Sequence, residues 1–344
     1  MGPFYFLGPY AGVDAVAKFQ KTIKRIGVYT SGGDAPGMNA AIRAVTRVGI
    51  HSGLEVVGIL GGYSGMLTSQ FQTLQLRSMA NIIQRGGTIL KTGRCPEFHR
   101  PEVRAEAAQH LQQAGIDACV CIGGDGSYAG AHALWLEHQM PIVGVPGTID
   151  NDIFGTDETI GFDTAVNTAL QAIDRIRDTA DSHDRLFIVE VMGRDSGFIA
   201  ANVGLAGGAE EIFAPDFPVP LEKVVEKIKA GQAKGKRSSI LITAEGQKPG
   251  RAYDLAEQLR KRANLDAKVC ILGHQQRGGS PTANDRILAS RLGAAAVQTL
   301  LLGECDVAVG TQGGRVASVP LEEAFTKNKQ TPQEFLQLAA ILAT

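Results

Sequence analysis

The sequence predicts an α/β fold with parallel sheets covered by helices on both faces. Three observations carry this prediction: short apolar runs that alternate with amphipathic segments, glycine-rich segments that follow these runs, and the length of the chain. The alternation is typical of parallel sheets, because each parallel crossover needs a helix. A chain of 344 residues exceeds most single hydrophobic cores, so we expect about two domains.

The expected strands and helices alternate along the chain. The runs expected to form strands cover residues 25–30, 54–60, 118–122, 142–145, 186–191, 239–243 and 269–272. The amphipathic stretches expected to form helices include residues 38–49, 103–113, 128–138, 162–178 and 221–229. A domain break is expected near Gly161, because the strongest phosphate-type loops precede it and a second strand–helix series follows.

The composition excludes several classes of protein. The chain has 42 glycines but only 14 prolines, which rules out collagen and argues against a disordered linker. Its 34 Lys and Arg residues balance 35 Asp and Glu residues, so it lacks the basic surplus of a sequence-independent nucleic-acid binder. No apolar stretch reaches the ~20 residues of a membrane span. The five cysteines include no CxxC pair, which argues against a zinc site or a redox motif.

The start of the chain is apolar but lacks the features of a targeting signal. It has no basic segment, and Gly8-Pro9 interrupts the apolar run. Phe6 stands where a myristoylation signal would have Ser or Thr. We expect residues 1–21 to be a poorly ordered extension, with a partner-contact role as the alternative, and we expect a cytoplasmic protein without membrane or nucleic-acid partners.

The segment IGGDGS, residues 122–127, follows an expected strand and has the composition of a phosphate-binding loop. Its glycines let backbone N–H groups approach a phosphate chain at the start of a helix. Asp125 suits Mg²⁺, which takes one or two carboxylates together with phosphate oxygens. An ordinary strand-to-helix turn is the alternative, and the segment matches neither a Walker loop nor GxGxxG.

The segment PGTIDND, residues 146–152, places two carboxylates two residues apart just beyond another strand. Asp150 and Asp152, beside Thr148, suit a pair in which one carboxylate accepts a hydroxyl proton and the other orients the hydroxyl or serves a metal. A turn with Asx hydrogen bonds explains the same residues equally well.

Three further segments combine glycine with polar residues at strand ends. Residues 31–39, SGGDAPGMN, lead into a helix on which Arg43 and Arg47 share a face, where plain solvation is the simpler explanation. Residues 191–194, VMGR, and residues 273–280, GHQQRGGS, place arginine beside glycine, which suits bidentate phosphate binding.

Together these segments resemble the family of bacterial ATP-dependent 6-phosphofructokinases. The matching motifs, in the family's order, are SGGDAPGMNAAIR, QRGGT, GGDGSY, PGTIDNDI, IDRIRDT, EVMGR and GHQQRGGSP, between about Lys24 and Gly293. The resemblance implies two Rossmann-like three-layer α/β domains, with the active site in the cleft between them, in a homotetramer. It divides the chain into an ATP- and Mg²⁺-binding domain, residues 22–160 plus 274–323, and a sugar-phosphate-binding domain, residues 161–273 plus 324–344.

The resemblance also implies the reaction, transfer of the γ-phosphoryl group of ATP to the 1-hydroxyl of fructose 6-phosphate. The implied catalytic residues are the base Asp150, its assistants Thr148 and Asp152, and the arginines Arg94 and Arg194, with Asp125 as the Mg²⁺ anchor. The implied ATP contacts are Gly32, Tyr63, Arg94, Cys95, Gly124, Asp125, Gly126 and Ser127. The implied sugar-phosphate contacts are Thr148, Ile149, Asp150, Arg185, Met192, Gly193, Arg194, Glu245, Lys268, His274 and Arg277, of which Arg185 resembles an arginine that reaches in from a neighbouring subunit.

Two glycines predict ATP rather than pyrophosphate as the phosphoryl donor. Pyrophosphate-using relatives carry an acidic residue where Gly126 stands and a lysine where Gly147 stands. Glycine at both positions leaves space for the α-phosphate and the nucleoside and removes the lysine that would recognise pyrophosphate.

The sequence departs from the family pattern at the sugar and effector sites. Lys268 replaces the second neighbour-subunit arginine and cannot make a two-pronged phosphate contact, so we expect a weaker sugar-phosphate clamp. Ser238 replaces a usual histidine and Leu76 a usual arginine of the effector pocket, and Asp195-Ser196-Gly197 is atypical after MGR. The retained effector residues are Arg43, Arg47, Arg177, Glu210, Lys234 and Lys236, which favour a polyanionic effector of open identity and sign.

Three alternatives remain at this stage. The chain is a related kinase for a nucleoside, sedoheptulose 7-phosphate or NAD, a pyrophosphate-dependent phosphofructokinase, or a non-catalytic sensing paralogue. The motifs PGTIDND, MGR and GHQQRGG argue against NAD and lipid kinases. Retention of Asp125, Asp150 and Asp152 argues against a paralogue that has lost catalysis.

Overall fold

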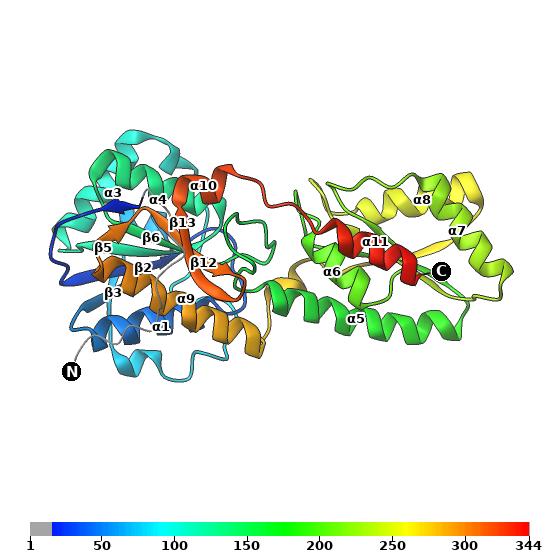
Figure 1. Cartoon of the computed structure of the whole chain (residues 1–344), viewed down its shortest axis with the longest axis horizontal. Coiled ribbons are helices and arrows are strands. Elements are labelled where there is room, and N and C mark those ends of the chain that lie inside the picture. Colours follow the sequence, from blue (N-terminus) through cyan, green and yellow to red (C-terminus); the bar gives the residue numbers. More distant parts are fainter. Residues whose placement is uncertain (1–15, 344) are drawn as a thin grey trace. The chain divides into compact units, whose positions relative to one another are not determined.

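The computed structural model describes residues 16–343, which separate into two compact units with their own sheets and cores (Figure 1). Unit 1 comprises the residues up to 149 together with 153–163 and 277–329. Unit 2 comprises residues 150–152, 164–276 and 330–343 of the described chain. Both units combine a largely parallel sheet with flanking helices, which confirms the predicted α/β class.

Unit 1 contains a seven-stranded sheet whose five central strands are parallel. In sheet order the strands are β13 (Arg315–Pro320), β12 (Val307–Gln312), β6 (Ile142–Pro146), β5 (Ala118–Gly123), β2 (Arg25–Thr30), β3 (Glu55–Ile59) and β4 (Phe71–Leu74). The edge strands β13 and β4 run antiparallel to their neighbours. All six residues of β5 are buried, because an apolar run in the middle of such a sheet is covered on both faces.

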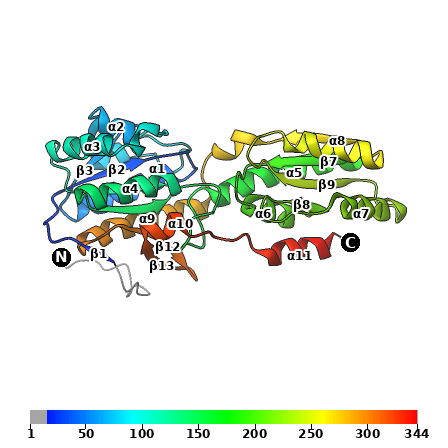
Figure 2. The same ribbon diagram turned by 90° about the horizontal axis from the view of Figure 1, so that it is seen from above.

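The helices of unit 1 form layers on the two faces of this sheet (Figures 1 and 2). On one face α1 (Met38–His51) packs against α9 (Ala283–Leu301). The other face carries α3 (Pro101–Gln113), α4 (Asp125–His138) and α10 (Leu321–Thr326). Short helices α2 (Tyr63–Leu67), η1 (Leu76–Met79) and η2 (Pro96–His99) lie in the connections. Helix α1 buries Met38, Ile42 and Val45, which share one face at helical spacing.

The segment before β2 is better ordered than expected. Strand β1 (Ala17–Lys18) pairs antiparallel with β11 (Glu304–Cys305), and the Lys21 ammonium lies 2.7 Å from the Asp117 carboxylate. The expectation of poor order is therefore wrong for this part of the extension, because backbone pairing and an ion pair hold it. Residues 1–15, to which the partner-contact alternative also applied, lie outside the described residues.

Unit 2 contains a four-stranded, entirely parallel sheet. In sheet order its strands are β10 (Ala267–Ile271), β7 (Leu186–Val191), β9 (Ser239–Ala244) and β8 (Glu211–Phe213). Its helices are α5 (Phe162–Ser182), α6 (Phe198–Ala206), α7 (Leu221–Ala233), α8 (Arg251–Ala263), α11 (Gln333–Leu342) and the short η3 (Gly273–Arg277). The core packs the sheet residues Ile188 and Leu241 against α7 and α8, and α6 packs against α11.

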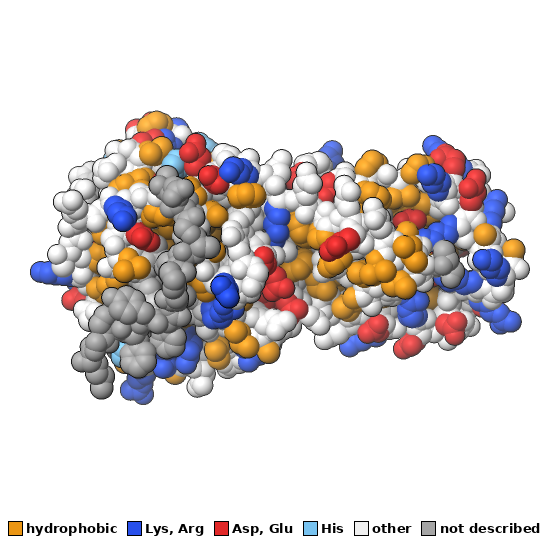
Figure 3. Space-filling model, in the orientation of Figure 1, with side chains coloured by type: hydrophobic (Ala, Val, Ile, Leu, Met, Phe, Trp, Pro, Cys, Tyr) orange, Lys and Arg blue, Asp and Glu red, His pale blue; other side chains and the backbone are white. Residues whose placement is uncertain are grey.

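The surface agrees with the balanced composition. On the face shown in Figure 3, basic and acidic side chains are interspersed and no broad single-sign patch forms. Among the helices of the described chain, none is both long and apolar enough to cross a bilayer.

An ion pair between the buried Arg104 and the exposed Glu137 joins helices α3 and α4 of unit 1. Arg104, 9% exposed, donates from Nε to the Glu137 carboxylate over 2.7 Å and from Nη1 to the Phe98 carbonyl over 2.8 Å. The hydrogen bond from Arg104 lowers the pKa of Glu137. The pair therefore stabilises the fold above the unfolded-state pKa of Glu, about 4.3, and this contribution is lost as the pH falls through the lower folded-state pKa.

We predict that Arg104→Met lowers the free energy of unfolding by about 1–3 kcal/mol at pH 7, because two acceptors lose their donor. The deficit should be smaller at a pH below the lowered folded-state pKa of Glu137, where its carboxylate is protonated. Urea unfolding at both pH values measures it. The matched control is Arg100→Met, because Arg100 is exposed and its ion pair with Glu102 is long, at 3.8 Å, and lies at the surface. An equal loss in both variants would contradict the prediction.

Candidate active site

The loops that follow three parallel strands of unit 1 meet at one edge of the sheet. Ser31, just after β2, donates its backbone N–H to the Ile122 carbonyl of β5 over 3.0 Å. Gly147, just after β6, donates to the Gly123 carbonyl over 3.0 Å. These bonds continue the sheet ladder beyond the strands, so the expected phosphate-type loops are adjacent in the fold.

The segment 123–127 forms a tight turn into α4. A Cβ on Gly123 would lie 2.5 Å from the Ser127 Oγ and 2.8 Å from the Ser31 carbonyl, so only glycine fits there. Gly32 has φ +84°, and a Cβ built on it would lie 3.5 Å from the same Ser127 hydroxyl. The start of α4 thus faces the β2 loop, and a helix start of this kind binds anions through its backbone N–H groups.

Asp125 is exposed at the first residue of α4. Within the described chain, no group of three or more His, Cys, Asp or Glu side chains forms a ready-made metal site. A single carboxylate at a helix start fits Mg²⁺, which takes its other ligands from phosphates and water.

Tyr63 packs against the turn that leads into α4 and forms a hydrogen bond with it. Its side chain is 4% exposed, and its hydroxyl donates to the Ser127 carbonyl and accepts from Tyr29 over 3.2 Å. Its ring stacks on Phe98 with centroids 4.0 Å apart, and burial raises the pKa of its hydroxyl well above the ordinary value. A Cβ on Gly130 would lie 2.8 Å from this ring, so the ring packs closely under α4.

Two other segments approach the β2 loop. Gly32 donates its N–H to the Gly93 carbonyl over 3.2 Å, which brings Arg94 and Cys95 to this edge. Arg94 is exposed, and Cys95 is half-buried. Arg277 donates from Nη1 to the Asp34 carbonyl over 3.1 Å, and its guanidinium lies 2.8 Å from a Cβ built on Gly33.

The segment 148–152 forms the turn that its sequence predicts. Asn151 is buried with φ +54°, so Asp150 and Asp152 flank a left-handed residue and both stay half-buried. The Asp150 carbonyl accepts a hydrogen bond from Ser196 Oγ over 2.9 Å. The Ile149 side chain is fully buried, so only its backbone is available to a ligand.

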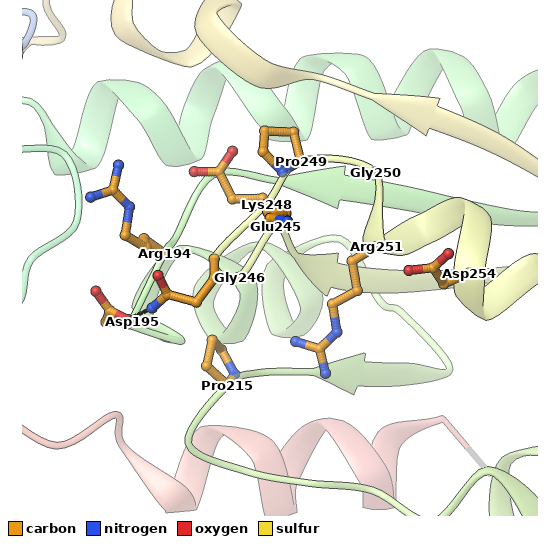
Figure 4. A pocket seen from close by; sticks show the side chains of 11 residues that line it. Arg194, Asp195, Pro215, Glu245, Gly246, Lys248, Pro249, Gly250, Arg251 and Asp254 are labelled. Carbon is orange, nitrogen blue, oxygen red and sulfur yellow. Dashed lines mark hydrogen bonds between the residues drawn. The ribbon is translucent and has the colours of Figure 1, made fainter.

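The carboxyl ends of β7 and β9 place four predicted sugar-phosphate residues together in unit 2. Met192, Gly193 and Arg194 follow β7, and Glu245 follows β9. Glu245 donates its N–H to the Val191 carbonyl over 2.9 Å, which ties the two loops together. Arg194 and Glu245 line a pocket of about 570 Å³ (Figure 4).

The same pocket is lined by two cations that no motif identified, Lys248 and Arg251. Lys248 lies in the segment between β9 and α8, and Arg251 is the first residue of α8; neither belongs to a family motif. The only signal for them in the sequence is the basic, glycine-rich composition after Glu245.

Two predicted sugar-phosphate residues, Arg185 and Lys268, lie near the opposite ends of these strands. Arg185 precedes β7, and Lys268 pairs in register with Phe187 near the amino ends of these strands. At ~3.3 Å per residue, the five steps from Phe187 to Met192 span about 16 Å. Lys268 is exposed and forms an ion pair of 2.8 Å with Asp266. His274 is exposed in η3.

The predicted effector residues fall into two groups, one in each unit. In unit 2 the Lys236 ammonium lies 2.8 Å from Glu210, and Arg177 donates to the Gly208 carbonyl over 3.0 Å, while Lys234 is exposed. In unit 1, Arg43 and Arg47 lie one turn apart on α1. Burial, together with the Arg47 charge, lowers the pKa of Arg43.

Comparison with known proteins assigns the chain to a family. The family profile described as phosphofructokinase matches residues 25–300. The chain belongs to the phosphofructokinase family. It is 59% identical over 321 residues to ATP-dependent 6-phosphofructokinase 1 of Thermus thermophilus, covering 93% of this chain and 100% of the relative. It is 51% identical to ATP-dependent 6-phosphofructokinase 2 of Bacteroides thetaiotaomicron, covering 92% of this chain and 98% of the relative.

Solved phosphofructokinase structures have the same fold. The Pichia pastoris phosphofructokinase in the T-state superposes with a TM-score of 0.82 at 35% identity, covering 89% of this chain but only 36% of that one. This phosphofructokinase therefore spans well under half of the Pichia chain. A pyrophosphate-dependent phosphofructokinase from Marinobacter aquaeolei has a TM-score of 0.80 at 22% identity over 92% of both chains, which shows likeness of fold alone.

The two donor-related glycines differ in their surroundings. A Cβ on Gly147 would lie 2.9 Å from Ile122 and 3.0 Å from Met38, whereas nothing lies within 4 Å of a Cβ on Gly126. The space attributed to Gly147 is thus filled by packed side chains, and only Gly126 faces open space.

We predict that Gly147→Lys lowers the free energy of unfolding by about 1–3 kcal/mol, because the side chain must displace packed core residues. Gly126→Asp should change it by less than about 0.5 kcal/mol, since a carboxylate in the first turn of a helix is tolerated. Thermal unfolding of the two variants measures the contrast. Equal stability of both would show that Gly147 is not a packing position.

Proposed function

We propose that this phosphofructokinase transfers the γ-phosphoryl group of ATP to the 1-hydroxyl of fructose 6-phosphate, giving fructose 1,6-bisphosphate and ADP. The observation that carries the proposal is the presence of both halves of the chemistry at strand ends: a phosphate-type loop into α4 and the Asp150–Asp152 pair. The names of its relatives, ATP-dependent 6-phosphofructokinases, support it.

Asp150 is the general base in this proposal. A carboxylate beside the sugar accepts the proton of the 1-hydroxyl as the oxygen attacks phosphorus. Thr148 and Asp152 orient the hydroxyl and the base. Ser196 donates a hydrogen bond to the Asp150 carbonyl, and Asn151 has a left-handed backbone. Both features fix the turn, so the Asp150 carboxylate is already in place before the reaction.

The nucleotide phosphates are bound by the loops of unit 1. Gly32 lies against the phosphates, backbone N–H groups at the start of α4 donate to them, and Arg94 binds the group in transfer. Gly124, Gly126 and Ser127 complete the proposed contacts, and Tyr63 and Cys95 lie next to them. Asp125 holds Mg²⁺, which, when bound, neutralises charge on the phosphate oxygens.

The sugar phosphate is bound through Met192, Gly193, Arg194, Glu245, His274 and Arg277. Arg185 and Lys268 lie at the opposite strand ends, which supports the proposal that they serve a neighbouring copy in a homotetramer. A cytoplasmic location is proposed on the same family grounds.

We predict that the purified chain phosphorylates fructose 6-phosphate with ATP and Mg²⁺, and much more slowly with pyrophosphate. A coupled assay with each donor measures this. Asp150→Ser should lower kcat by about 10²–10⁴-fold, because it removes the base while leaving the phosphate and sugar contacts in place.

The matched control for this variant is Asp181→Ser, an exposed aspartate on α5. Full activity of Asp150→Ser would refute the mechanism. Higher turnover with pyrophosphate would refute the choice of donor, and turnover only with a nucleoside or with sedoheptulose 7-phosphate would refute the choice of acceptor.

Regulation by a polyanion is proposed at Arg43, Arg47, Arg177, Glu210, Lys234 and Lys236. The support is electrostatic: Arg43 and Arg47 are adjacent like charges, and no described residue pairs with the buried Arg47 Nε. An anionic effector would supply the missing partner.

We predict that Arg47→Ala abolishes the response to a polyanionic effector, because it removes half of this cation pair. The measurement is the ratio of rates with and without ADP, ATP, phosphoenolpyruvate or citrate at subsaturating fructose 6-phosphate. Lys24→Ala, an exposed site on unit 1, is the control. An unchanged ratio in Arg47→Ala for an effector of the wild type would remove this pocket from the proposal.

A further inference from the structure

The loop of residues 85–93 in unit 1 carries a family motif that has no role in the proposed function. The motif is QRGGT, residues 84–88, and the loop ends immediately before Arg94, the residue proposed to bind the group in transfer. The Arg94 side chain is long and exposed. Because such a side chain has many rotamers, the position of its charge depends on the backbone from which it extends.

A buried amide holds the first half of this loop. Asn39, the second residue of α1, is 1% exposed. Its Nδ2 donates to the Arg85 carbonyl over 3.0 Å and to the Gly86 carbonyl over 3.2 Å. Its Oδ1 accepts the N–H of Ile89 over 2.8 Å. Both amide protons and the amide oxygen of Asn39 are thus bonded to the backbone of one loop.

A buried hydroxyl holds the second half of the loop. Thr30, the last residue of β2, is 0% exposed, and its Oγ1 donates to the Lys91 carbonyl over 2.7 Å. The same oxygen lies 3.0 Å from the Thr88 Oγ1, and since a hydroxyl has one proton, Thr88 is the donor in this pair. Lys91 has φ +59°, a left-handed conformation that is unfavourable for a residue with a side chain. The bond from Thr30 therefore stabilises a conformation that the loop does not favour by itself.

The end of the loop is bonded to the β2 loop at the edge of the sheet. The Thr92 hydroxyl donates to the Gly32 carbonyl over 2.9 Å, and the Gly32 N–H donates to the Gly93 carbonyl over 3.2 Å. At the start of the loop, a Cβ on Gly86 would clash with the Gly279 carbonyl, so the two backbones pack directly together. The loop is thus fixed at its start, its middle and its end, and Arg94 follows the last of these contacts by one residue.

We propose that Asn39 and Thr30 are positioning residues for Arg94, because they hold the loop from which its guanidinium reaches the phosphoryl group in transfer. The inference rests on the proposed function, which gives Arg94 this role. A displacement of about 1 Å at a group that positions the reactants can lower the rate ~10²-fold. Buried side chains behind the loop therefore control the rate of phosphoryl transfer through Arg94.

The first test removes the Thr30 hydroxyl and keeps the size of the side chain. Thr30→Val should lower kcat about tenfold or more and leave the KM for ATP and for fructose 6-phosphate within about threefold, because Arg94 acts mainly on the transition state. Thr30→Ser, which keeps the hydroxyl, should recover most of the lost kcat.

The matched control is Thr46→Val on α1. Thr46 is also 0% exposed, and its hydroxyl donates to the Ile42 carbonyl over 2.8 Å. Thr46→Val and Thr30→Val should lower the melting temperature by similar amounts, since each loses one buried hydroxyl. Thr46→Val should nevertheless keep kcat within about twofold of the wild type.

A double-mutant cycle with Arg94→Ala separates positioning from general support of the fold. With Arg94→Ala present, Thr30→Val should change kcat by less than about twofold, because no guanidinium remains to be positioned. A residue that only supports the fold would lower kcat by the same factor in both backgrounds. Asn39→Ala is the second variant, and it should lower kcat about tenfold or more with Arg94 present and little in its absence. It decides the test if Thr30→Val does not fold.

The outcomes separate the two claims. A wild type that fails to phosphorylate fructose 6-phosphate with ATP would overturn the proposed function. An active wild type whose Thr30→Val and Asn39→Ala variants keep its kcat would overturn this inference and leave the proposed function standing. The same holds for equal losses of kcat with and without Arg94, for a loss in Thr30→Val no larger than that in Thr46→Val, and for a failure of both variants to fold.

Discussion

The parallel register of neighbouring strands is the constraint on which the candidate site depends. Parallel strands end at a common edge, and here backbone bonds extend the ladder into the loops: Ser31 to Ile122 and Gly147 to Gly123 in unit 1, and Glu245 to Val191 in unit 2. Each loop is thereby fixed to its neighbour before any ligand arrives. Pre-organised groups lose little freedom on binding, which favours both affinity and rate.

The glycines at these edges act in two different ways. Gly123 and Gly193 are sterically required, because a Cβ would lie 2.5 Å from another atom in each case. Gly126 has open space around it, so its lack of a side chain matters to a ligand and not to the fold. Gly147 is also a packing position, although its place in the sequence motif suggested that it leaves space for a ligand. Glycine is therefore required by packing at some of these positions, whereas Gly126 leaves open space at the start of α4.

Buried polar groups position the exposed ones. The hydroxyl of Tyr63 holds the turn that presents Asp125, and the carboxylate of Glu190 holds the helix start that presents Arg251. In both pairs the buried member forms hydrogen bonds within the protein, and the outer member lies at the first residue of a helix. This division explains why residues without any family motif influence the geometry of the site.

The sequence by itself determined the α/β class, seven of the strands and the motifs at their ends, because apolar runs and glycine-rich turns are local signals. It did not indicate the antiparallel hairpin of β12 and β13 or the pairing of β1 with β11. Only the tertiary structure decided that Arg185 and Lys268 lie far from Glu245 along their strands while Arg251 lies beside it. Strand register and helix placement set those distances, and both arise from contacts between residues that are remote in sequence.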